Sequence, residues 1–534
     1  MQKTIAMRLL PHEAAHDASI RQCIAAEAGV APAAVSGYYI RRQSIDARGK
    51  TVWVNLQVEA FLHEPAQPRP PAVFHFQQVQ RARQQMLIVG AGPAGLFAAL
   101  QCLEAGIKPI VLERGKDVRA RRRDLAAINK QGEVNPESNY CFGEGGAGTY
   151  SDGKLYTRST KRGNVQRILQ LLVHFGADER ILYEAHPHIG TNKLPHIISA
   201  IREHIIACGG EVHFGQRVTS LLLQGDRCAG VRTADGQQWK ADACVLATGH
   251  SARDVFGMLQ QQGIAIEAKP FALGVRIEHP QSIIDSAQYH CLVRSEYLPP
   301  ASYSLVQQAQ GRGVFSFCMC PGGIIAPAAT APGEVVVNGW SPSKRNNPYA
   351  NSGMVTEIRL ADVQHLPADF EAVTGQPRHT LQSALGTMYF QQYVERKAYA
   401  AGGGRLVAPA QRMADFVQRK ASVSLPDCSY LPGIASADLH AVLPPVVAAA
   451  LQEGLQAFGQ KMKGYYTNEA VLVATESRTS SPVRIPRHAS TLEHVQISRL
   501  YPCAEGAGYA GGIVSAAMDG ENCVRQAVLQ YLHP

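Results

Sequence analysis

Three glycines stand at a fixed spacing directly after an apolar run, and this spacing is typical of a phosphate-binding turn. Gly90, Gly92 and Gly95 follow residues 86–89 and open a segment rich in alanine and leucine. In such a strand-to-helix turn the first glycine makes the tight bend, the second lets the backbone approach a diphosphate, and the third lets the helix pack on the strand. The diphosphate then lies at the positive end of the helix. The segment therefore predicts a dinucleotide site.

Glu113 closes the same unit. It ends a second apolar run, residues 109–112, and Arg114 follows it. An acidic residue at the end of the second strand accepts ribose hydroxyl groups. Because strand, helix, second strand and acidic terminus occur in this order, we expect a complete β-α-β nucleotide-binding unit rather than an ordinary turn.

Two further glycine-rich segments lie at residues 143–148 and 505–512. A backbone without side chains can wrap a flat or phosphorylated ligand. The alternative for the first segment is a mobile surface loop, but Tyr140, Phe142 and Tyr150 flank it, and aromatic residues are depleted in disordered loops. The second segment precedes an expected helix, residues 514–532, whose positive N-terminal end would favour an anionic ligand group. We therefore expect both segments to contact the same ligand.

An apolar run at residues 243–247 ends in Ala247, Thr248 and Gly249. It follows expected strands at 211–214, 218–223 and 228–233. A strand in this place is expected to return to the nucleotide-binding sheet, where its small terminal residues let the backbone pass beside the ligand.

Together these motifs resemble a bacterial family of functionally uncharacterised FAD-dependent dehydrogenases. The resemblance rests on residues 90–95, 142–149, 247–249 and 505–512, extends to 188–194, 317–323 and 476–484, and covers nearly the whole chain. More distantly, the chain is similar to the flavoproteins grouped with glutathione reductase and fumarate reductase, whose FAD domain is discontinuous. The resemblance implies FAD as the cofactor and leaves NAD(P)H as a candidate transient electron donor, but it supplies no substrate.

Glu505 and Gly506 stand where many members of the wider class carry Gly-Asp, so the chain departs from the pattern of that class at Glu505. The residues expected to contact FAD are Gly90, Gly92, Pro93, Ala94, Gly95, Glu113, Arg114, Gly145, Gly146, Ala147, Thr149, Val218, Ala247, Thr248, Gly249, Glu505, Gly506, Gly511, Gly512 and Ile513.

Candidates for catalysis come from residue chemistry alone. Arg276, Arg478 and Arg484 can bind a substrate carboxylate in bidentate fashion, although a structural or surface role is the commoner one for each. His188 can transfer a proton because histidine titrates near physiological pH, and a structural histidine is the equal alternative.

Cys318 and Cys320 alternate along an expected strand, so both thiols face one side. Two small buried residues are the favoured interpretation, and the sequence leaves open whether these thiols or that of Cys503 are redox-active. The 12 cysteines show no Cys-x-x-Cys pair and no Cys/His metal spacing, so we expect neither a disulfide framework nor a metal site.

The predicted fold class is α/β, with a discontinuous Rossmann-like FAD-binding domain, an inserted α+β substrate domain and a small N-terminal β-α-β-β domain of ferredoxin-like type. With 534 residues the chain is too long for one core. The expected divisions are 1–65 for the small domain, 66–84 for a proline-containing linker, 85–264 and 486–534 for the FAD-binding domain, and 265–485 for the insertion. Within the insertion we expect strands at 271–277, 313–319 and 334–338 and helices at 380–400 and 444–460.

Composition restricts the class of partner. Apolar residues make up 46% and charged residues 18%, as in ordinary globular proteins, and no apolar run approaches the roughly 20 residues that span a bilayer. No signal segment precedes the first domain, so we expect a cytoplasmic protein without membrane contact. The net charge is +9, and the basic clusters at 121–123 and at Arg158, Lys161 and Arg162 are expected to be solvated rather than bound to nucleic acid.

Three hypotheses follow. The first is an oxidoreductase with tightly bound FAD that transfers hydride to or from an unidentified small molecule. The alternatives are a flavin-dependent RNA-modifying protein that uses its basic clusters, and a non-catalytic flavin-binding scaffold. The sequence leaves the oligomeric state open.

Overall fold

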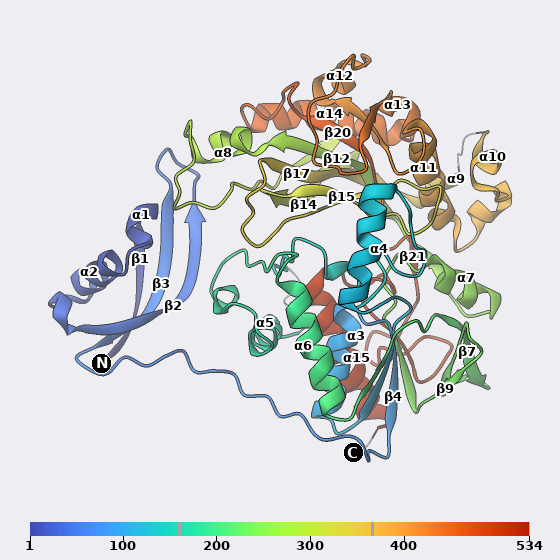
Figure 1. The fold of residues 1–534 in the computed structure, drawn as a ribbon, viewed down its shortest axis with the longest axis horizontal. Helices are drawn as coiled ribbons and strands as arrows, with labels where there is room; N and C mark the ends of the chain where they lie inside the picture. Colours follow the sequence, from blue (N-terminus) through green and yellow to red (C-terminus); the bar gives the residue numbers. More distant parts are fainter. Residues whose placement is uncertain (158–162, 365–367, 533–534) are drawn as a thin grey trace.

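The computed structural model describes residues 1–157, 163–364 and 368–532. A small N-terminal domain, a nucleotide-binding part and a domain built on a large sheet follow one another around the molecule (Figure 1). The basic residues Arg158, Lys161 and Arg162 lie outside the described residues.

The N-terminal domain is a three-stranded antiparallel sheet with helices on one face. Strand β3 lies in the centre, and β1 pairs with it from Gln2 opposite Phe61 to Leu9 opposite Val54. Ile24 of α2 belongs to the same hydrophobic core as Val58 and Leu62 of β3. The elements are β1 (Gln2–Leu9), α1 (Pro11–Ala14), α2 (Asp17–Ala28), β2 (Val35–Asp46) and β3 (Trp53–Leu62), which confirms the expected order.

The linker that follows runs in extended form along the edge of the nucleotide-binding part (Figure 1). The Gln77 N–H donates to the carbonyl of Leu103, and the Val79 N–H donates to the carbonyl of Cys208. These bonds hold the linker against two helix ends, so the chain enters the first strand of the next sheet from a fixed direction.

Five parallel strands form the nucleotide-binding sheet, in the order β22, β10, β4, β5, β6. Their bounds are β4 (Gln85–Val89), β5 (Lys108–Leu112), β6 (Glu211–His213), β10 (Ala243–Leu246) and β22 (Leu500–Pro502). Strand β10 lies beside β4, with Cys244 opposite Leu87. The expected return of the chain to this sheet is therefore confirmed, and β22 adds a second return from far along the sequence.

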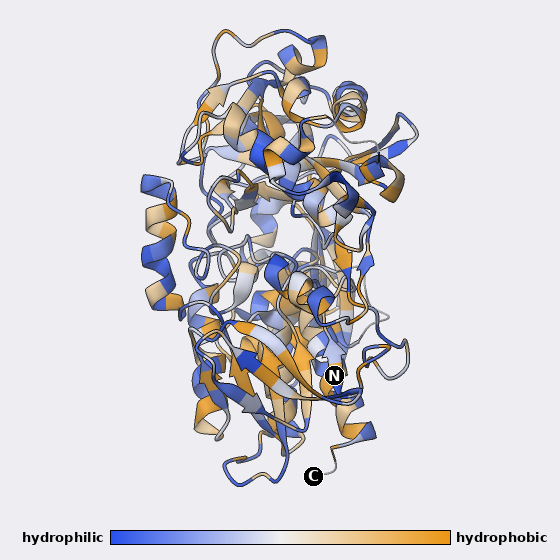
Figure 2. Ribbon diagram, turned by 90° about the vertical axis from the view of Figure 1, so that its right-hand side faces the viewer, coloured by the Kyte–Doolittle hydropathy of each residue, from blue (hydrophilic) through white to orange (hydrophobic). Residues whose placement is uncertain are grey.

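Both faces of this sheet are covered, which explains why its strands are continuously apolar. Met86 and Ile88 face a layer of helices, while Leu87 and Val89 face a small antiparallel sheet and one helix. The first layer is α3 (Pro93–Glu104), α5 (Val165–His174), α6 (Leu194–Ala207) and α15 (Ile513–Gln530); the second is β7 (Val218–Gln224), β8 (Arg227–Thr233), β9 (Gln238–Lys240) and α7 (Arg253–Gln261). Hydrophobic strands lie in the interior of this part and hydrophilic residues on its outer loops (Figure 2).

A seven-stranded sheet carries the other large domain, and α4 (Val118–Gln131) reaches toward it from the nucleotide-binding part (Figure 1). The strands in spatial order are β13 (Val306–Ala309), β14 (Arg312–Pro321), β17 (Tyr349–Ile358), β12 (Phe271–Pro280), β20 (Val471–Glu476), β18 (Ala408–Arg412) and β19 (Ile434–Ser436). Around it lie α8 (Gln281–Tyr289), α9 (Leu360–Gln364), α10 (Phe370–Thr374), α11 (Gly386–Ala401), α12 (Met413–Gln418), α13 (Leu439–Val442) and α14 (Pro445–Lys461). Two short ribbons complete it: β15 (Ile324–Pro327) with β16 (Val337–Trp340), and β11 (Glu267–Ala268) with β21 (Val483–Arg484).

Two elements of this domain differ from expectation. The helix expected from residue 380 begins at Gly386, after a 3₁₀ turn at Arg378–Gln382. The chain folds back tightly there, because a Cβ at Gly386 would lie 2.0 Å from the Leu381 carbonyl oxygen. The strand expected from Glu334 begins at Val337, since the buried Glu334 side chain is bound to arginines.

Among the described helices, none combines the length and apolar character that a membrane crossing requires.

Candidate functional site

One pocket gathers the glycine-rich turns that the sequence places far apart. It lies at the carboxyl ends of the parallel strands, where such sheets bind ligands. Of the residues expected to contact the cofactor, those lining it are Gly90, Gly92, Pro93, Ala94, Glu113, Arg114, Gly146, Ala147, Val218, Ala247, Thr248, Gly249, Glu505, Gly512 and Ile513.

The remaining five expected residues do not line the pocket but support the conformation of the glycine turns. A Cβ at Gly95 would lie 1.9 Å from the Gly90 carbonyl oxygen, and one at Gly506 would lie 2.6 Å from the Gly249 oxygen. Gly145 has φ of 76°, and the Thr149 hydroxyl donates to the Glu144 carbonyl at 2.7 Å. The Gly511 carbonyl accepts a bond from the Ser515 hydroxyl inside the first turn of α15. These positions support the turns, and the structure does not place them on the pocket wall.

Gly92 has a different environment from Gly95. A Cβ at Gly92 would meet no atom closer than Gly146 Cα at 3.9 Å, so the space beside its backbone is open to the pocket. Helix α3 begins next to it at Pro93, and α15 begins at Ile513 with Gly512 as its N-cap. Two helix N-termini, each with unpaired N–H groups and a positive dipole end, therefore border the pocket.

Three neighbouring polar atoms of the pocket wall have no partner within the described part of the chain. They are the Thr248 Oγ1, His250 Nε2 and Ser251 Oγ atoms, and all three are buried. Because buried polar groups are almost always hydrogen-bonded, these atoms indicate a polar ligand in the pocket. A dinucleotide with phosphates, hydroxyls and a heterocyclic ring fits this donor and acceptor set.

Glu113 lies at the expected end of β5 and is 5% exposed. Its Oε2 accepts the Ala91 N–H and its Oε1 accepts the N–H groups of Gly115 and Gly143, each at 2.9 Å. The carboxylate thus joins the first glycine turn to the segment at 143–148. Its contact with a ribose stays a prediction.

Arg114 has partners on three sides. Its guanidinium binds Glu137 at 3.0 Å and Asp254 at 2.9 Å, and lies 4.2 Å from the centre of the Phe142 ring. The side chain forms part of the pocket wall near Val218. Stacked and paired in this way, it offers a flat surface to an aromatic base.

Of the four catalytic candidates, only Arg478 lines the pocket. Its guanidinium binds Glu395 at 3.0 Å, Glu334 at 2.9 Å and the Thr330 hydroxyl at 2.6 Å. Arg276 is fully buried and binds Glu476 at 2.8 Å, Asn351 at 2.8 Å and the Cys318 carbonyl at 2.6 Å. These partners favour the structural alternative for both arginines.

His188 and Arg484 do not line the pocket. The His188 Nε2 atom lies 3.2 Å from the Ser343 carbonyl. Burial, with the nearby Arg345 charge, lowers the pKa of His188 to about 4, so its ring is neutral at physiological pH. Arg484 is exposed and lies over the Tyr509 ring. This geometry favours a structural histidine and a surface arginine.

His250 is a pocket residue that the sequence analysis did not single out. The residue lines the pocket, its Nδ1 atom lies 3.3 Å from Glu505 Oε2, and its Nε2 atom is buried without a partner among the described residues. The signal was present, since His250 directly follows the Ala-Thr-Gly turn. Its pairing with Glu505 was not predictable, because the two residues are brought together only by β10 and β22.

A second group that the sequence analysis did not bring together lies on the pocket wall where residues 152–154 meet strand β14 of the large domain. Lys154 Nζ lies 3.9 Å from Cys318 Sγ, 3.7 Å from Cys320 Sγ and 3.7 Å from Asp152 Oδ2. Asp152, Lys154 and Cys318 all line the pocket. Asp152 also binds Arg345 at 2.7 Å, and the charges of Lys154 and Arg345 overcome the effect of burial and lower its pKa to about 2.

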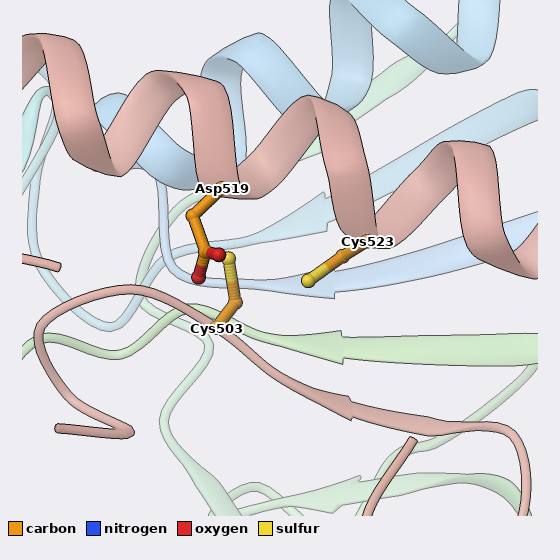
Figure 3. A group of neighbouring side chains, drawn as sticks. All are labelled: Cys503, Asp519 and Cys523. Carbon is orange, nitrogen blue, oxygen red and sulfur yellow. The ribbon is translucent and has the colours of Figure 1, made fainter. Parts of the chain in front are cut away.

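Figure 3 shows another cysteine cluster, in which Asp519 and Cys523 of α15 point toward Cys503 after β22. The ligand atoms lie within 4.8 Å of one another. However, both Asp519 oxygens bind Arg487, at 2.9 and 2.7 Å, and Oδ2 also accepts the Ala504 N–H. A cation at this place would face the Arg487 charge, so the cluster is an ion pair that holds α15 to the loop.

The sheet order, the glycine turns and the pocket define a dinucleotide-binding flavoprotein. A protein of Clostridium beijerinckii, described as uncharacterized, is 41% identical over 445 residues, which cover 83% of this chain and 80% of the relative. The family described as FAD-dependent protein, C-terminal domain-like, matches residues 270–479, and a domain of unknown function matches residues 1–61. The chain belongs to this family of FAD-dependent proteins, and the expected FAD cofactor is confirmed.

Solved structures share the fold only loosely. CtdE in complex with FAD is 10% identical, with a TM-score of 0.31 and coverage of 82% of each chain. The 2,6-dihydroxypyridine-3-hydroxylase of Arthrobacter nicotinovorans is 10% identical, with a TM-score of 0.36 and coverage of 83% of this chain and 82% of that one. Similarity at this level does not indicate which reaction the protein catalyses.

Proposed function

We propose that the protein is an FAD-dependent oxidoreductase that transfers hydride between a small molecule and tightly bound FAD, with NAD(P)H as a transient donor. The observation that carries the proposal comes from three residues of the pocket wall: the Thr248 Oγ1, His250 Nε2 and Ser251 Oγ atoms are buried and have no partner among the described residues. A purely structural cavity would leave these groups at a cost of roughly 1–3 kcal/mol each.

The residues that would hold FAD are those of the three turns. Gly92 and the N-terminus of α3 present N–H groups to a diphosphate, and Glu113 presents a carboxylate at the end of β5. The N-terminus of α15, at Gly512 and Ile513, presents a positive end that stabilises negative charge. FAD supplies two-electron redox chemistry when bound, and the protein supplies orientation and electrostatics.

His250 is the group best placed to move a proton in this pocket. Glu505 faces Nδ1, which favours the tautomer with the proton on that atom and leaves Nε2 as the proton acceptor. Such a carboxylate–histidine pair holds the ring in one orientation. In the proposed reaction His250 transfers the proton, a role for which His188 was a candidate in the sequence.

Steady-state turnover tests the proposal. We would measure NADH and NADPH oxidation by the holoprotein with dioxygen, quinones, disulfides and fumarate as acceptors, and analyse products to separate a dehydrogenase from a hydroxylase. His250→Gln should lower kcat by ~10²-fold or more and remove a pH dependence, because a general acid–base contributes on this scale. His188→Gln is the matched control and should leave kcat within about threefold. Absence of turnover with every donor and acceptor would favour a non-catalytic flavin-binding protein.

A further inference from the structure

The Cys318 and Cys320 thiols form a pair that the proposed flavin chemistry does not use. Strand β14 has a bulge between Phe317 and Cys320, and Cys318 has a positive φ of 49°. A bulky residue rarely adopts this conformation, and such positions are concentrated at functional sites. The irregular backbone places both sulfurs beside Lys154, whose Nζ lies 3.9 Å from Cys318 Sγ and 3.7 Å from Cys320 Sγ.

The two cysteines differ in access. Cys318 is partly exposed and lines the FAD pocket, whereas Cys320 is buried behind it. Arg276 Nη2 lies 3.6 Å from Cys320 Sγ, and the Cys320 thiol also donates to the Cys318 carbonyl. The Cys318 thiol is therefore accessible to a ligand in the pocket, whereas the Cys320 thiol is accessible only to Cys318.

The charges around Cys318 favour a thiolate. The cations are Lys154 and Arg276, and the acids are Asp152, which is paired with Arg345, and Glu476, which is paired with Arg276. The hydrogen bond from Cys320, together with the charge of Lys154, lowers the pKa of the Cys318 thiol to about 5, while the pKa of Cys320 is raised. A thiolate is the nucleophile in thiol–disulfide exchange.

We propose that Cys318 and Cys320 are a redox-active dithiol in the FAD pocket, which reduces a small disulfide substrate and is itself restored by reduced FAD. This inference rests on the proposed oxidoreductase function and names the substrate class of the same pocket. The proposal rests on three observations: the two cysteines lie close together on β14, Lys154 lies beside both sulfurs, and Cys318 lines the pocket.

The proposed thiol–disulfide exchange takes place in two successive attacks. The Cys318 thiolate attacks one substrate sulfur, the substrate S–S bond breaks, and the first substrate thiolate takes a proton from the Lys154 ammonium. The Lys154 amine then takes the Cys320 proton, and the Cys320 thiolate attacks the Cys318 sulfur and releases the second substrate thiolate. That thiolate takes a proton through Lys154, and solvent restores the ammonium. Two electrons pass to the substrate. Restoring the Cys318 thiolate and the Cys320 thiol from the disulfide takes two electrons and one proton, which reduced FAD would supply.

Counting reducing equivalents tests the dithiol in the oxidised holoprotein. An anaerobic dithionite titration should consume two equivalents per FAD, one for the flavin and one for the disulfide, each a two-electron couple. Cys318→Ser and Cys320→Ser should each consume one equivalent. Cys523→Ser, which removes a thiol from the other close pair, should still consume two. Consumption of only one equivalent by the wild-type protein, the value expected for Cys320→Ser, would overturn the proposal.

Peptide mapping gives an answer that does not depend on stable variants. In oxidised wild-type protein the peptide carrying Cys318 and Cys320 should resist alkylation and be lighter by two hydrogens, and a reductant should make both thiols reactive. Free thiols in the oxidised protein would contradict the proposal. Cys320→Ser treated with cystamine should retain cysteamine on Cys318, because the second thiol is missing.

The two proposals fail separately. Dithionite reduces FAD without a nicotinamide. Consumption of two equivalents without NAD(P)H turnover would therefore refute NAD(P)H as the donor and support the redox-active dithiol. Turnover with NAD(P)H, together with consumption of a single equivalent in the dithionite titration, would support the oxidoreductase function and refute the redox-active dithiol.

Discussion

Gly92 and Gly95 are three residues apart, yet the structure gives them opposite tasks. The space beside Gly92 is open to the pocket, whereas a Cβ at Gly95 would lie 1.9 Å from the Gly90 carbonyl oxygen. The first glycine therefore serves the ligand and the second serves the packing of α3 on β4. A substitution at each position separates binding from folding.

Gly92→Val should lower the FAD content of the purified protein by ~tenfold or more, because its side chain enters the space where the diphosphate would lie. The free energy of unfolding of the apoprotein should change by less than about 1 kcal/mol, since no protein atom is crowded. Flavin content and urea unfolding measure the two effects. Gly257→Ala is the matched control, because a Cβ there meets no atom within 4 Å. Full flavin content in folded Gly92→Val would contradict this placement of the cofactor.

At the scale of elements, helix α15 contributes its N-terminus to the pocket. Gly512 has φ of 87°, which proline cannot adopt, but Ile513 begins the helix, where proline is tolerated. Ile513→Pro therefore removes one N–H donor without breaking α15.

Ile513→Pro should make the midpoint potential of bound FAD more negative by roughly 20–60 mV, because a lost donor to an anionic group costs about 1–3 kcal/mol over two electrons. Ile513→Ala is the control, since it loses the same side-chain contacts and keeps the N–H group. The potential is measured by spectroelectrochemistry, with circular dichroism on the same sample. Equal potentials in both variants would show that α15 only holds the cofactor.

The β-α-β unit was predictable because its requirements are local: the glycines, the apolar runs and Glu113 follow one another within one stretch of sequence. The return of β10 to the sheet was also predictable, since its short apolar run ends in small residues. The break before α11 was not, because the tight contact of Gly386 with Leu381 leaves no mark on the apolar pattern.

The chemistry of the pocket was less predictable than its turns. Lys154 and Cys318 come from segments 164 residues apart and meet only because the large domain packs on the glycine turns. Likewise, the carboxylates that bind Arg276 and Arg478 lie on other elements, so the sequence alone left substrate binding open beside the commoner structural role.

At the scale of the molecule, a buried ion-pair network joins the nucleotide-binding part to the large domain. Arg253 of α7 binds Glu334 at 3.0 Å and Glu395 at 2.7 Å, and Arg478 binds the same two carboxylates. Because Arg478 also lines the pocket, the network fixes the position of the large domain relative to the cofactor.

Acid should weaken this junction. Burial alone would raise the pKa of Glu395, but the charges of Arg253 and Arg478 lower it to about 2, below the value of about 4.3 in an unfolded chain. Its stabilising contribution, on the order of 3 kcal/mol, is therefore complete above about pH 4.5 and is lost as the pH falls toward 2.

Urea unfolding of wild-type protein and Glu395→Gln at several pH values measures this contribution. The difference in unfolding free energy should be largest at neutral pH and shrink below pH ~4.5. Glu357→Gln is the control, because its carboxylate forms a half-exposed pair with Arg359 and should show little pH-dependent difference. A difference for Glu395→Gln that stays constant down to pH ~2.5 would contradict the ion-pair account.

The central claim is that the pocket holds FAD as a working redox cofactor. Anaerobic absorbance titration of the purified holoprotein with NADH and NADPH tests it most directly. We predict one FAD per chain, loss of the oxidised-flavin absorbance on addition of one of the two donors, and its return on addition of an oxidant. Protein whose bound flavin is reduced by neither donor, or which carries no flavin, would contradict the account.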